Sequence, residues 1–141
     1  MDSVNDMLKR LEQLNVIGAS LSRERDIDRL LENILLAAKT ITHADGGTLY
    51  RLSDDGGSLR FEIIRTDSLH IAMGGTSGIP ISFPDLPLVD AQGAPNDSLV
   101  AAYAAIHQQT VNIVDAYTEP NFDFSGTRQF DERTGYRSQS F

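Results

Sequence analysis

Apolar residues at helical spacing dominate the first part of the chain. They alternate steps of three and four, as in the seam of paired helices, at Val4, Met7, Leu11, Leu14 and Leu21. The stretch spans about two and a half heptads, which fits a helix that pairs with a second copy and also a helix that lies on its own domain. We interpret residues 1–21 as a dimerisation helix and residues 22–141 as the domain that follows it.

A second helix is predicted over residues 27–41. Its apolar positions share one helical face, namely Ile27, Leu30, Leu31, Ile34, Leu35, Ala38 and Ile41. Asp26 is placed to accept hydrogen bonds from the first backbone N–H groups of this helix. Arg29, Glu32 and Asn33 fall on the other face and are expected to point away from the core.

The pattern then changes to the alternation that is typical of strands. Thr48–Leu52 and Leu59–Arg65 are predicted to form a β-hairpin, because the Ser, Asp and Gly residues between them favour tight turns. A third strand over residues 79–83 is predicted at a sheet edge, since Pro80 has no N–H to donate. The glycine-rich run 73–78 lacks the ending of a phosphate-binding loop and is expected to be a mobile loop.

The second half of the chain predicts one short helix and further extended structure. The helix has Asn96 or Asp97 as its expected N-cap and carries Leu99, Val100, Tyr103 and Ile106. A fourth strand follows at Val111 and Ile113, and the closing stretch, residues 112–141, is interpreted as a polar loop that enters a strand near Tyr136. The rings, carboxylates and hydroxyls of this closing stretch have the composition of a small-ligand pocket.

Composition narrows the functions that the chain can have. With 12 Lys and Arg against 20 Asp and Glu, the net charge is -8, which disfavours nucleic acid and anionic membranes as partners. The absence of cysteine excludes disulfides, thiolate metal sites and cysteine nucleophiles. No apolar run reaches the ~18 residues of a membrane span, so we expect a cytoplasmic protein. His43, His70 and His107 fall in separate predicted elements and predict no metal site.

The strongest pattern lies in the closing stretch, where the chain resembles a known family. The residues that carry it are Asn112–Tyr117 (Asn-Ile-Val-Asp-Ala-Tyr), Pro120, Phe122, Asp131 and Thr134–Ser138 (Thr-Gly-Tyr-Arg-Ser). They resemble the signature of GAF domains, the sensory and regulatory modules of cyclic-nucleotide phosphodiesterases, nucleotide cyclases and histidine kinases. The run from Ala44 to Tyr50 and the hairpin after it are also similar to that family.

The resemblance implies an α+β fold, with a PAS-like, GAF-like antiparallel sheet, flanking helices and a ligand pocket. It also implies a homodimer joined through the N-terminal helix. The implied ligand contacts are Thr48, Asp131, Thr134 and Ser138, with Phe122 or Phe124 as a stacking wall. It names no cofactor, and the absence of the usual attachment cysteine disfavours a covalent bilin.

The chain departs from the family pattern in three places. The segment from Phe122 to Asp131 is longer than in the phosphodiesterases, and the excursion from Asp85 to Pro95 is expected to be an addition. The dispersed Asn-Lys, Phe and Asp-Glu signature of cyclic-nucleotide-binding members, like the last strand or strands of the family sheet, would lie beyond Phe141. We therefore expect a GAF domain truncated at its C-terminus, whose exposed edge pairs with a second chain or lacks ordinary sheet continuity. In a longer protein, an effector domain would follow it.

These patterns favour a non-enzymatic sensor domain that binds a small molecule, with cyclic nucleotides as one candidate class, and relays a signal through dimer helices. The alternative is a dimerisation and relay module with no ligand. An enzyme is disfavoured, because Asp123, Asp131 and Glu132 have no positioned nucleophile beside them.

Overall fold

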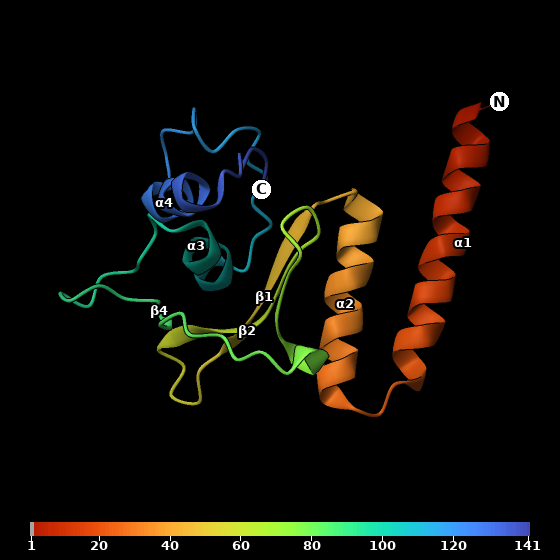
Figure 1. The fold of residues 1–141 in the computed structure, drawn as a ribbon, viewed down its shortest axis with the longest axis horizontal. Coiled ribbons are helices and arrows are strands. Elements are labelled where there is room, and N and C mark those ends of the chain that lie inside the picture. The colour runs from red at the N-terminus through yellow and green to blue at the C-terminus, as the bar shows by residue number, and fades with distance from the viewer. Residues whose placement is uncertain (1) are drawn as a thin grey trace. The chain divides into compact units, whose positions relative to one another are not determined.

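The computed structural model describes residues 2–141, and within them it contains four α-helices and an antiparallel sheet of four strands (Figure 1). This confirms the predicted α+β class. Contacts divide the chain into two compact units: the first comprises the residues up to Tyr50 and Phe61–Phe83, and the second comprises Arg51–Arg60 and Pro84–Phe141. Within residues 2–141, no helix is both long enough and apolar enough to cross a bilayer.

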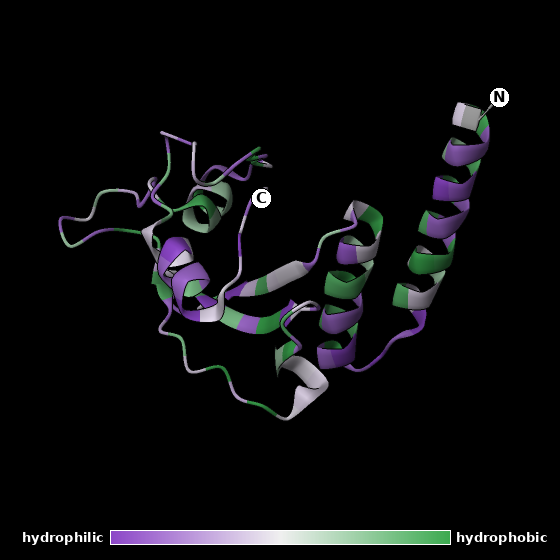
Figure 2. Cartoon of the chain, turned by 45° about the horizontal axis from the view of Figure 1, so that its top comes forward, coloured by the Kyte–Doolittle hydropathy of each residue, from purple (hydrophilic) through white to green (hydrophobic). Residues whose placement is uncertain are grey.

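The first unit begins with two helices, α1 (Asp2–Arg23) and α2 (Ile27–Thr42), which lie side by side in Figure 1. Both were predicted, and Figure 2 shows hydrophobic and hydrophilic residues alternating along each of them. The Asp26 carboxylate caps α2 by accepting hydrogen bonds from Asp28 N at 2.9 Å and Arg29 N at 3.2 Å. The sequence therefore encodes the start of α2 locally, through a single side chain.

The prediction for Glu32 was wrong, because this side chain is buried at 7% exposure instead of pointing away from the core. Its carboxylate forms an ion pair with Arg65 of β2 and accepts a hydrogen bond from the Thr76 hydroxyl. A buried carboxylate is tolerated when its oxygens are paired in this way. Helical periodicity could not reveal these partners, since they come from residues far along the chain.

The sheet is built around β2 (Ser58–Thr66), which lies between β1 (Gly46–Leu52) and β3 (Ile71–Gly74). In the first unit, β2 pairs with β3 in antiparallel register, with Ile63 opposite Gly74 and Thr66 opposite Ile71. In the second unit, the start of β2 pairs with β4 (Leu86–Pro87), with Leu59 opposite Leu86. The hairpin of β1 and β2 was predicted.

The third strand was predicted in the wrong place. Residues 79–83 form no strand, and β3 instead covers Ile71–Gly74, followed by the short 3-10 helix η1 (Gly75–Ser77). Part of the expected glycine-rich loop is therefore a strand. Gly74 explains this placement, since it has φ 70° and ψ −172° and a Cβ there would lie 1.9 Å from the Glu62 carbonyl oxygen. Only glycine lets the two backbones approach so closely.

The second unit contains α3 (Val100–His107) and α4 (Ser125–Thr134). The helix α3 was predicted, but neither expected cap is used: Leu99 is the N-cap and makes no side-chain hydrogen bond. Asn96 donates to the Pro87 carbonyl at 2.9 Å and Asp97 bonds His107 at 2.8 Å, so both side chains have other partners.

The helix α4 replaces the later part of the polar loop that was expected before the Thr-Gly-Tyr turn. The predicted strands at Val111 and Tyr136 are also absent as strands of the sheet. Their neighbours form a short extended pair instead, in which Ile113 N donates to Phe141 O at 2.7 Å and Ala116 N donates to Gln139 O at 2.8 Å. Two residues of this pair, Ile113 and Ala116, form the buried core of the unit together with Phe124.

We predict that Gly74→Ala lowers the free energy of unfolding by about 2–4 kcal/mol, because the new methyl group would overlap the Glu62 backbone and because the combination of positive φ with extended ψ is strained for any residue except glycine. Urea unfolding would measure the change. Gly78→Ala is the matched control, since Gly78 also has positive φ (73°) but open space around its Cβ position, and it should cost only about 1–2 kcal/mol. Equal losses in the two variants would contradict the proposed backbone clash.

Candidate ligand-binding site in the second unit

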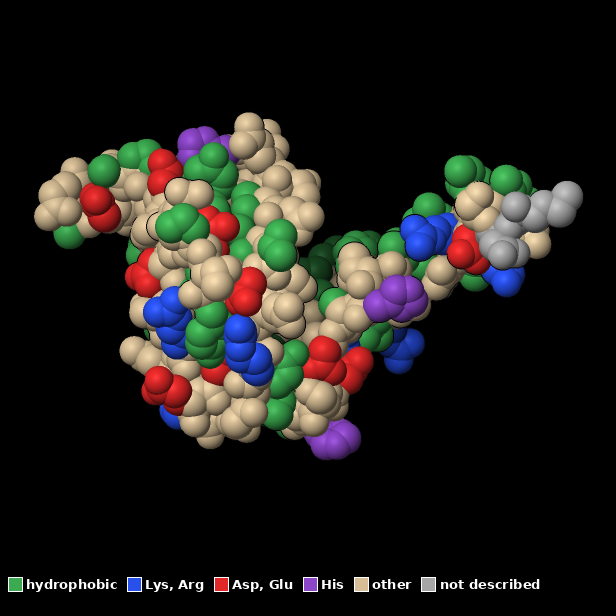
Figure 3. All heavy atoms as spheres, turned by 90° about the horizontal axis from the view of Figure 1, so that it is seen from above, with side chains coloured by type: hydrophobic (Ala, Val, Ile, Leu, Met, Phe, Trp, Pro, Cys, Tyr) green, Lys and Arg blue, Asp and Glu red, His purple; other side chains and the backbone are tan. Residues whose placement is uncertain are grey.

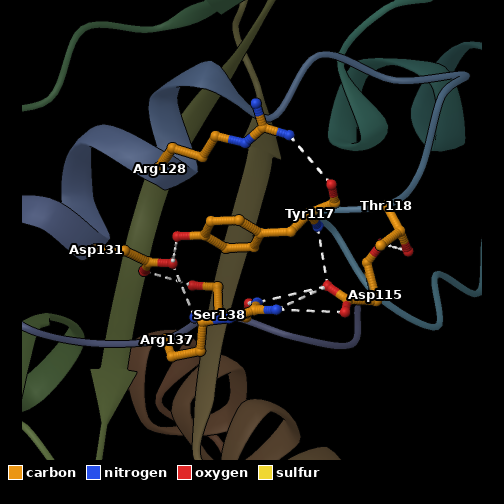
Figure 4. Close-up of polar contacts among 7 residues, drawn as sticks. All are labelled: Asp115, Tyr117, Thr118, Arg128, Asp131, Arg137 and Ser138. Carbon is orange, nitrogen blue, oxygen red and sulfur yellow. Dashed lines mark hydrogen bonds and ion pairs between the residues drawn. The ribbon is translucent and has the colours of Figure 1, made fainter.

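A hydrogen-bonded cluster around Asp131 connects three parts of the second unit (Figure 4). Asp131 lies on α4 and is buried at 4% exposure. Its carboxylate accepts hydrogen bonds from the Tyr117 hydroxyl at 2.7 Å, from Ser138 N at 2.8 Å and from Ser138 Oγ at 2.8 Å. The cluster thus joins the loop before α4, the helix itself and the segment after it.

Burial and hydrogen bonding act on the pKa of Asp131 in opposite directions. Burial raises this pKa, but the hydrogen bonds from Tyr117 and Ser138, together with the nearby positive charge of Arg137, outweigh it, and the pKa lies below its usual value. The hydrogen bond to Asp131 also raises the pKa of Tyr117, because removing the phenol proton would place two anions side by side. Asp131 is therefore an anion and Tyr117 a neutral donor at neutral pH.

The Tyr117 ring is held by two guanidinium groups. The Arg137 guanidinium carbon lies 3.8 Å from the ring centroid and that of Arg128 lies 5.3 Å from it. Asp115 fixes Arg137 through an ion pair of 3.3 Å and also accepts from Tyr117 N at 2.9 Å. These cation–π contacts and the ion pair orient the phenol hydroxyl toward Asp131 (Figure 4).

A hollow of about 540 Å³ lies elsewhere in the second unit, beside the end of α3. Its polar lining residues are Asp97, Gln109, Thr110, Asn112 and Asn121. Its apolar lining residues are Tyr103, Val111 and Phe122. The rings of Tyr103 and Phe122 meet edge to face at 5.3 Å, and the His107 ring packs on Tyr103 at 4.3 Å. The lining combines the Tyr103 and Phe122 rings with five exposed polar side chains, so the hollow is more open and more polar than the usual small-molecule pocket.

Neither region contains the ligand set of a metal centre. Within residues 2–141, no three His, Cys, Asp or Glu side chains gather closely enough to hold a metal ion. On the face drawn in Figure 3, Lys and Arg side chains are interspersed with Asp and Glu and form no continuous basic surface.

Comparisons with known proteins identify the fold. No protein-family model matches the sequence, and no curated protein matches it. Among solved structures, the GAF domain of a phosphoenolpyruvate-protein phosphotransferase from Acinetobacter matches with a TM-score of 0.58 at 12% identity over 81% of this chain. The corresponding GAF domain from Coxiella burnetii matches with a TM-score of 0.55 at 10% identity over 85% of this chain. The chain has the GAF-domain fold. It spans 61% of the length of each of these two structures.

Five of the six predicted ligand contacts lie in the second unit, and they do not form one cluster there. Asp131 and Ser138 are brought together, but they bind each other. Thr134 is the last residue of α4, where its hydroxyl donates to the Phe130 carbonyl at 2.8 Å, and Gly135 then ends the helix with φ 72°. Within the second unit, the predicted site thus divides into the Asp131 cluster and positions outside it.

The remaining predicted ligand contacts, Phe122, Phe124 and Thr48, lie on different structural elements. Phe122 lines the hollow, whereas Phe124 is buried in the core at 7% exposure and its ring lies 5.4 Å from that of Phe141. Thr48 lies on β1 in the first unit. Of the predicted aromatic contacts, only Phe122 is thus placed on a hollow that the structure describes.

Sequence reasoning missed Tyr117 and Tyr103. Tyr117 was part of the family signature but received no role, because its partners Asp131 and Arg137 are distant in the sequence. Tyr103 was treated as an apolar helix residue. Its spacing of four from His107 was the available signal, since residues at i and i+4 share one face of a helix.

We predict that Asp131→Ala lowers the free energy of unfolding by about 3 kcal/mol, because it leaves the buried Ser138 N–H without an acceptor. Asp131→Asn should cost less, since its amide group still accepts from Ser138 N while its NH₂ donates to Ser138 Oγ. Glu132→Ala is the control: it removes the same charge from an exposed neighbouring position. Denaturant unfolding measures all three, and an equal loss for Glu132→Ala would contradict the role of the cluster.

The contribution of Asp131 should also depend on pH. Its pKa is lowered in the folded protein, so the stabilisation is fully present above the unfolded pKa of about 3.9 and disappears as pH falls through the folded pKa. The stability difference between the unmodified chain and Asp131→Ala should therefore be constant from about pH 7 to 5 and shrink below about pH 4. A difference that grows on acidification would refute the assigned sign.

Proposed function

We propose that this GAF domain is a non-catalytic sensory and regulatory domain of a larger cytoplasmic signalling protein. It binds a small molecule and relays the signal to an effector domain through paired α1 helices of a homodimer. The fold likeness supports this proposal, since both similar structures are GAF domains that belong to larger phosphotransferase proteins. The relay part rests on features of α1 and the ligand part on the hollow beside α3.

The exposed seam of α1 is the observation that carries the proposal. Met7, Leu11 and Leu14 are 62%, 51% and 48% exposed, although they occupy the positions that would pack between paired helices. An apolar stripe on a long helix stabilises the protein only when it is covered. A second copy supplies a matching stripe at the same spacing, which gives a self-complementary contact.

The hollow beside α3 supports the ligand part of the proposal. Phe122 and Tyr103 offer ring surfaces there, and neighbouring amide groups offer hydrogen bonds. Cyclic nucleotides are the first candidate class, because their bases can stack on such rings. Asp131, Thr134, Ser138 and Thr48 stay predicted contacts from the family resemblance, with Phe124 as a second stacking wall.

A relay module without a ligand is the second candidate function. Asp131 already accepts three hydrogen bonds from its own chain, and the Thr134 hydroxyl is bound to the Phe130 carbonyl. Residues that are satisfied internally have little capacity left for a ligand. In that case the Asp131 cluster would only hold the segment after α4 in place.

We predict that Leu11→Asp combined with Leu14→Asp weakens dimerisation about 100-fold or more, because two apolar side chains per copy would be replaced by charges at the seam. Sedimentation equilibrium measures the dimer constant. Asn5→Asp combined with Gln13→Asp is the control: it adds the same charge to exposed polar positions of α1 and should leave the constant unchanged. If the unmodified chain is monomeric at every concentration, the proposed relay through paired α1 helices is overturned.

We further predict that cyclic AMP or cyclic GMP binds with measurable heat and that Phe122→Ala weakens this binding about tenfold, the usual effect of losing a stacking ring. Isothermal titration calorimetry measures both. Phe83→Ala, which removes a ring from the first unit, is the control and should leave the affinity unchanged. Identical affinities for the unmodified chain and Phe122→Ala would argue against binding at the hollow.

A further inference from the structure

A second exposed apolar surface lies on α2. Ile27, Ile34 and Ile41 repeat every seven residues and are 60%, 41% and 43% exposed. Seven residues make almost two whole helical turns, so these side chains form one continuous line along the helix, which we call the α2 stripe. Leu35 and Lys39 are buried on another face of α2, beside β1. The α2 stripe is therefore separate from the face that packs the helix against its own domain.

The helical face around the α2 stripe is free of charged side chains. Leu30, Leu31 and Ala38 flank the three isoleucines on this face, and all three are apolar. A charged or polar partner would lose hydration against such a surface without gaining hydrogen bonds or ion pairs. The composition of the α2 stripe therefore fits the apolar face of another helix.

The seam of α1 has the same spacing as the α2 stripe. Its members Met7, Leu14 and Leu21 also repeat every seven residues, and α1 and α2 run in opposite directions on either side of residues 24–26 (Figure 1). Antiparallel helices place residues that are equally far from their joint at the same height. Counted from residue 24, the facing levels are Met7 with Ile41, Leu14 with Ile34, and Leu21 with Ile27.

Within one chain, α1 leaves the α2 stripe uncovered. At two of the three levels, the side chains of both helices stay exposed: Met7 is 62% and Leu14 is 48% exposed, opposite the exposed Ile41 and Ile34. The two helices thus carry matching apolar positions at matching heights without burying them against each other. A surface of this kind is stabilised when a further helix covers it.

A second copy of the chain supplies that helix. If its α1 lies antiparallel beside α2, a two-fold axis along the helices reproduces the same three levels between the copies, and it does so twice. The seam and the α2 stripe together offer on the order of 700 Å² of apolar surface per copy, close to the about 800 Å² per partner of a standard interface, whereas the seam alone offers roughly 400 Å². Pairing of the α1 helices alone would also leave the α2 stripe in water.

We infer that the interface between two copies is a four-helix bundle, in which α1 of each copy packs against the α2 stripe of the other in the register Met7–Ile41, Leu14–Ile34 and Leu21–Ile27. The inference rests on the proposed homodimer and specifies its contact. It makes α2 part of the interface, so that the helix carrying the buried Glu32 touches the second copy directly.

Introduced cysteines test the register, because the chain contains none of its own. Chains with Met7→Cys, mixed with Ile41→Cys chains of different mass, should form a disulfide-linked hybrid on mild oxidation, since a disulfide requires Cα atoms within about 7 Å. The control replaces Ile41→Cys by Thr40→Cys, an exposed position at nearly the same height but about 100° away around α2. The control mixture should give several-fold less hybrid.

A charge in the α2 stripe tests its contribution to affinity. Ile34→Asp should weaken dimerisation about tenfold or more in sedimentation equilibrium, because dimerisation would bury an unpaired carboxylate. Thr40→Asp adds the same charge to an exposed polar position of α2 and should leave the dimer constant unchanged. Circular dichroism shows whether both variants are folded, and the cysteine hybrids decide the question if Ile34→Asp is not.

The outcomes separate this inference from the proposed function. The four-helix interface is overturned by a Met7–Ile41 hybrid no more abundant than the control, or by a folded Ile34→Asp chain that dimerises as tightly as the unmodified chain. The relay through paired α1 helices still stands in either case if Leu11→Asp with Leu14→Asp weakens the dimer. A chain that never dimerises overturns both.

Discussion

The second unit depends on one buried carboxylate. Asp131 lies on α4 and connects the loop before this helix with the extended segment after it. Its carboxylate accepts hydrogen bonds from the Tyr117 hydroxyl in the loop and from the N–H and hydroxyl groups of Ser138 in the segment. An ionised carboxylate has acceptor sites for three donors and binds them more strongly than a neutral acid would, and these hydrogen bonds in turn keep it ionised. The irregular path after α4 follows from this requirement, because Ser138 must return to Asp131 while Gly135 turns the chain.

The first unit also contains a buried carboxylate on a helix, and it binds partners from other segments of that unit. Glu32 is buried on α2 and binds Arg65 of β2 and Thr76 of η1. In each unit a buried carboxylate on a helix therefore contacts a neighbouring short segment: η1 in one case and the segment after α4 in the other. Removing one partner from such a cluster is costly, since it leaves a buried polar group without compensation.

The sequence predicted those elements whose signals are local. The helices α1 and α2, the Asp26 cap, the hairpin of β1 and β2 and the α+β class all follow from periodicity and turn residues within a short window. The failures have a different origin. Glu32 looked solvent-facing because Arg65 and Thr76 are brought to it only by folding, and α4 looked like a loop because few of its residues are apolar. Asp131 and Ser138 were found through the family pattern, but a pattern could not show that they bind each other.

The connection between α1 and α2 gives the first unit a mechanical property. Only residues 24–26 separate the two helices, and two of these side chains form hydrogen bonds: Glu24 accepts from the backbone N–H groups of Arg25 and Asp26, and Asp26 caps α2. A linker this short, whose backbone N–H groups already donate hydrogen bonds, has few conformations available to absorb a movement of α1. A rotation of α1 would thus be passed on to α2, which carries Glu32 and its ion pair with Arg65 of β2, instead of being absorbed within the joint.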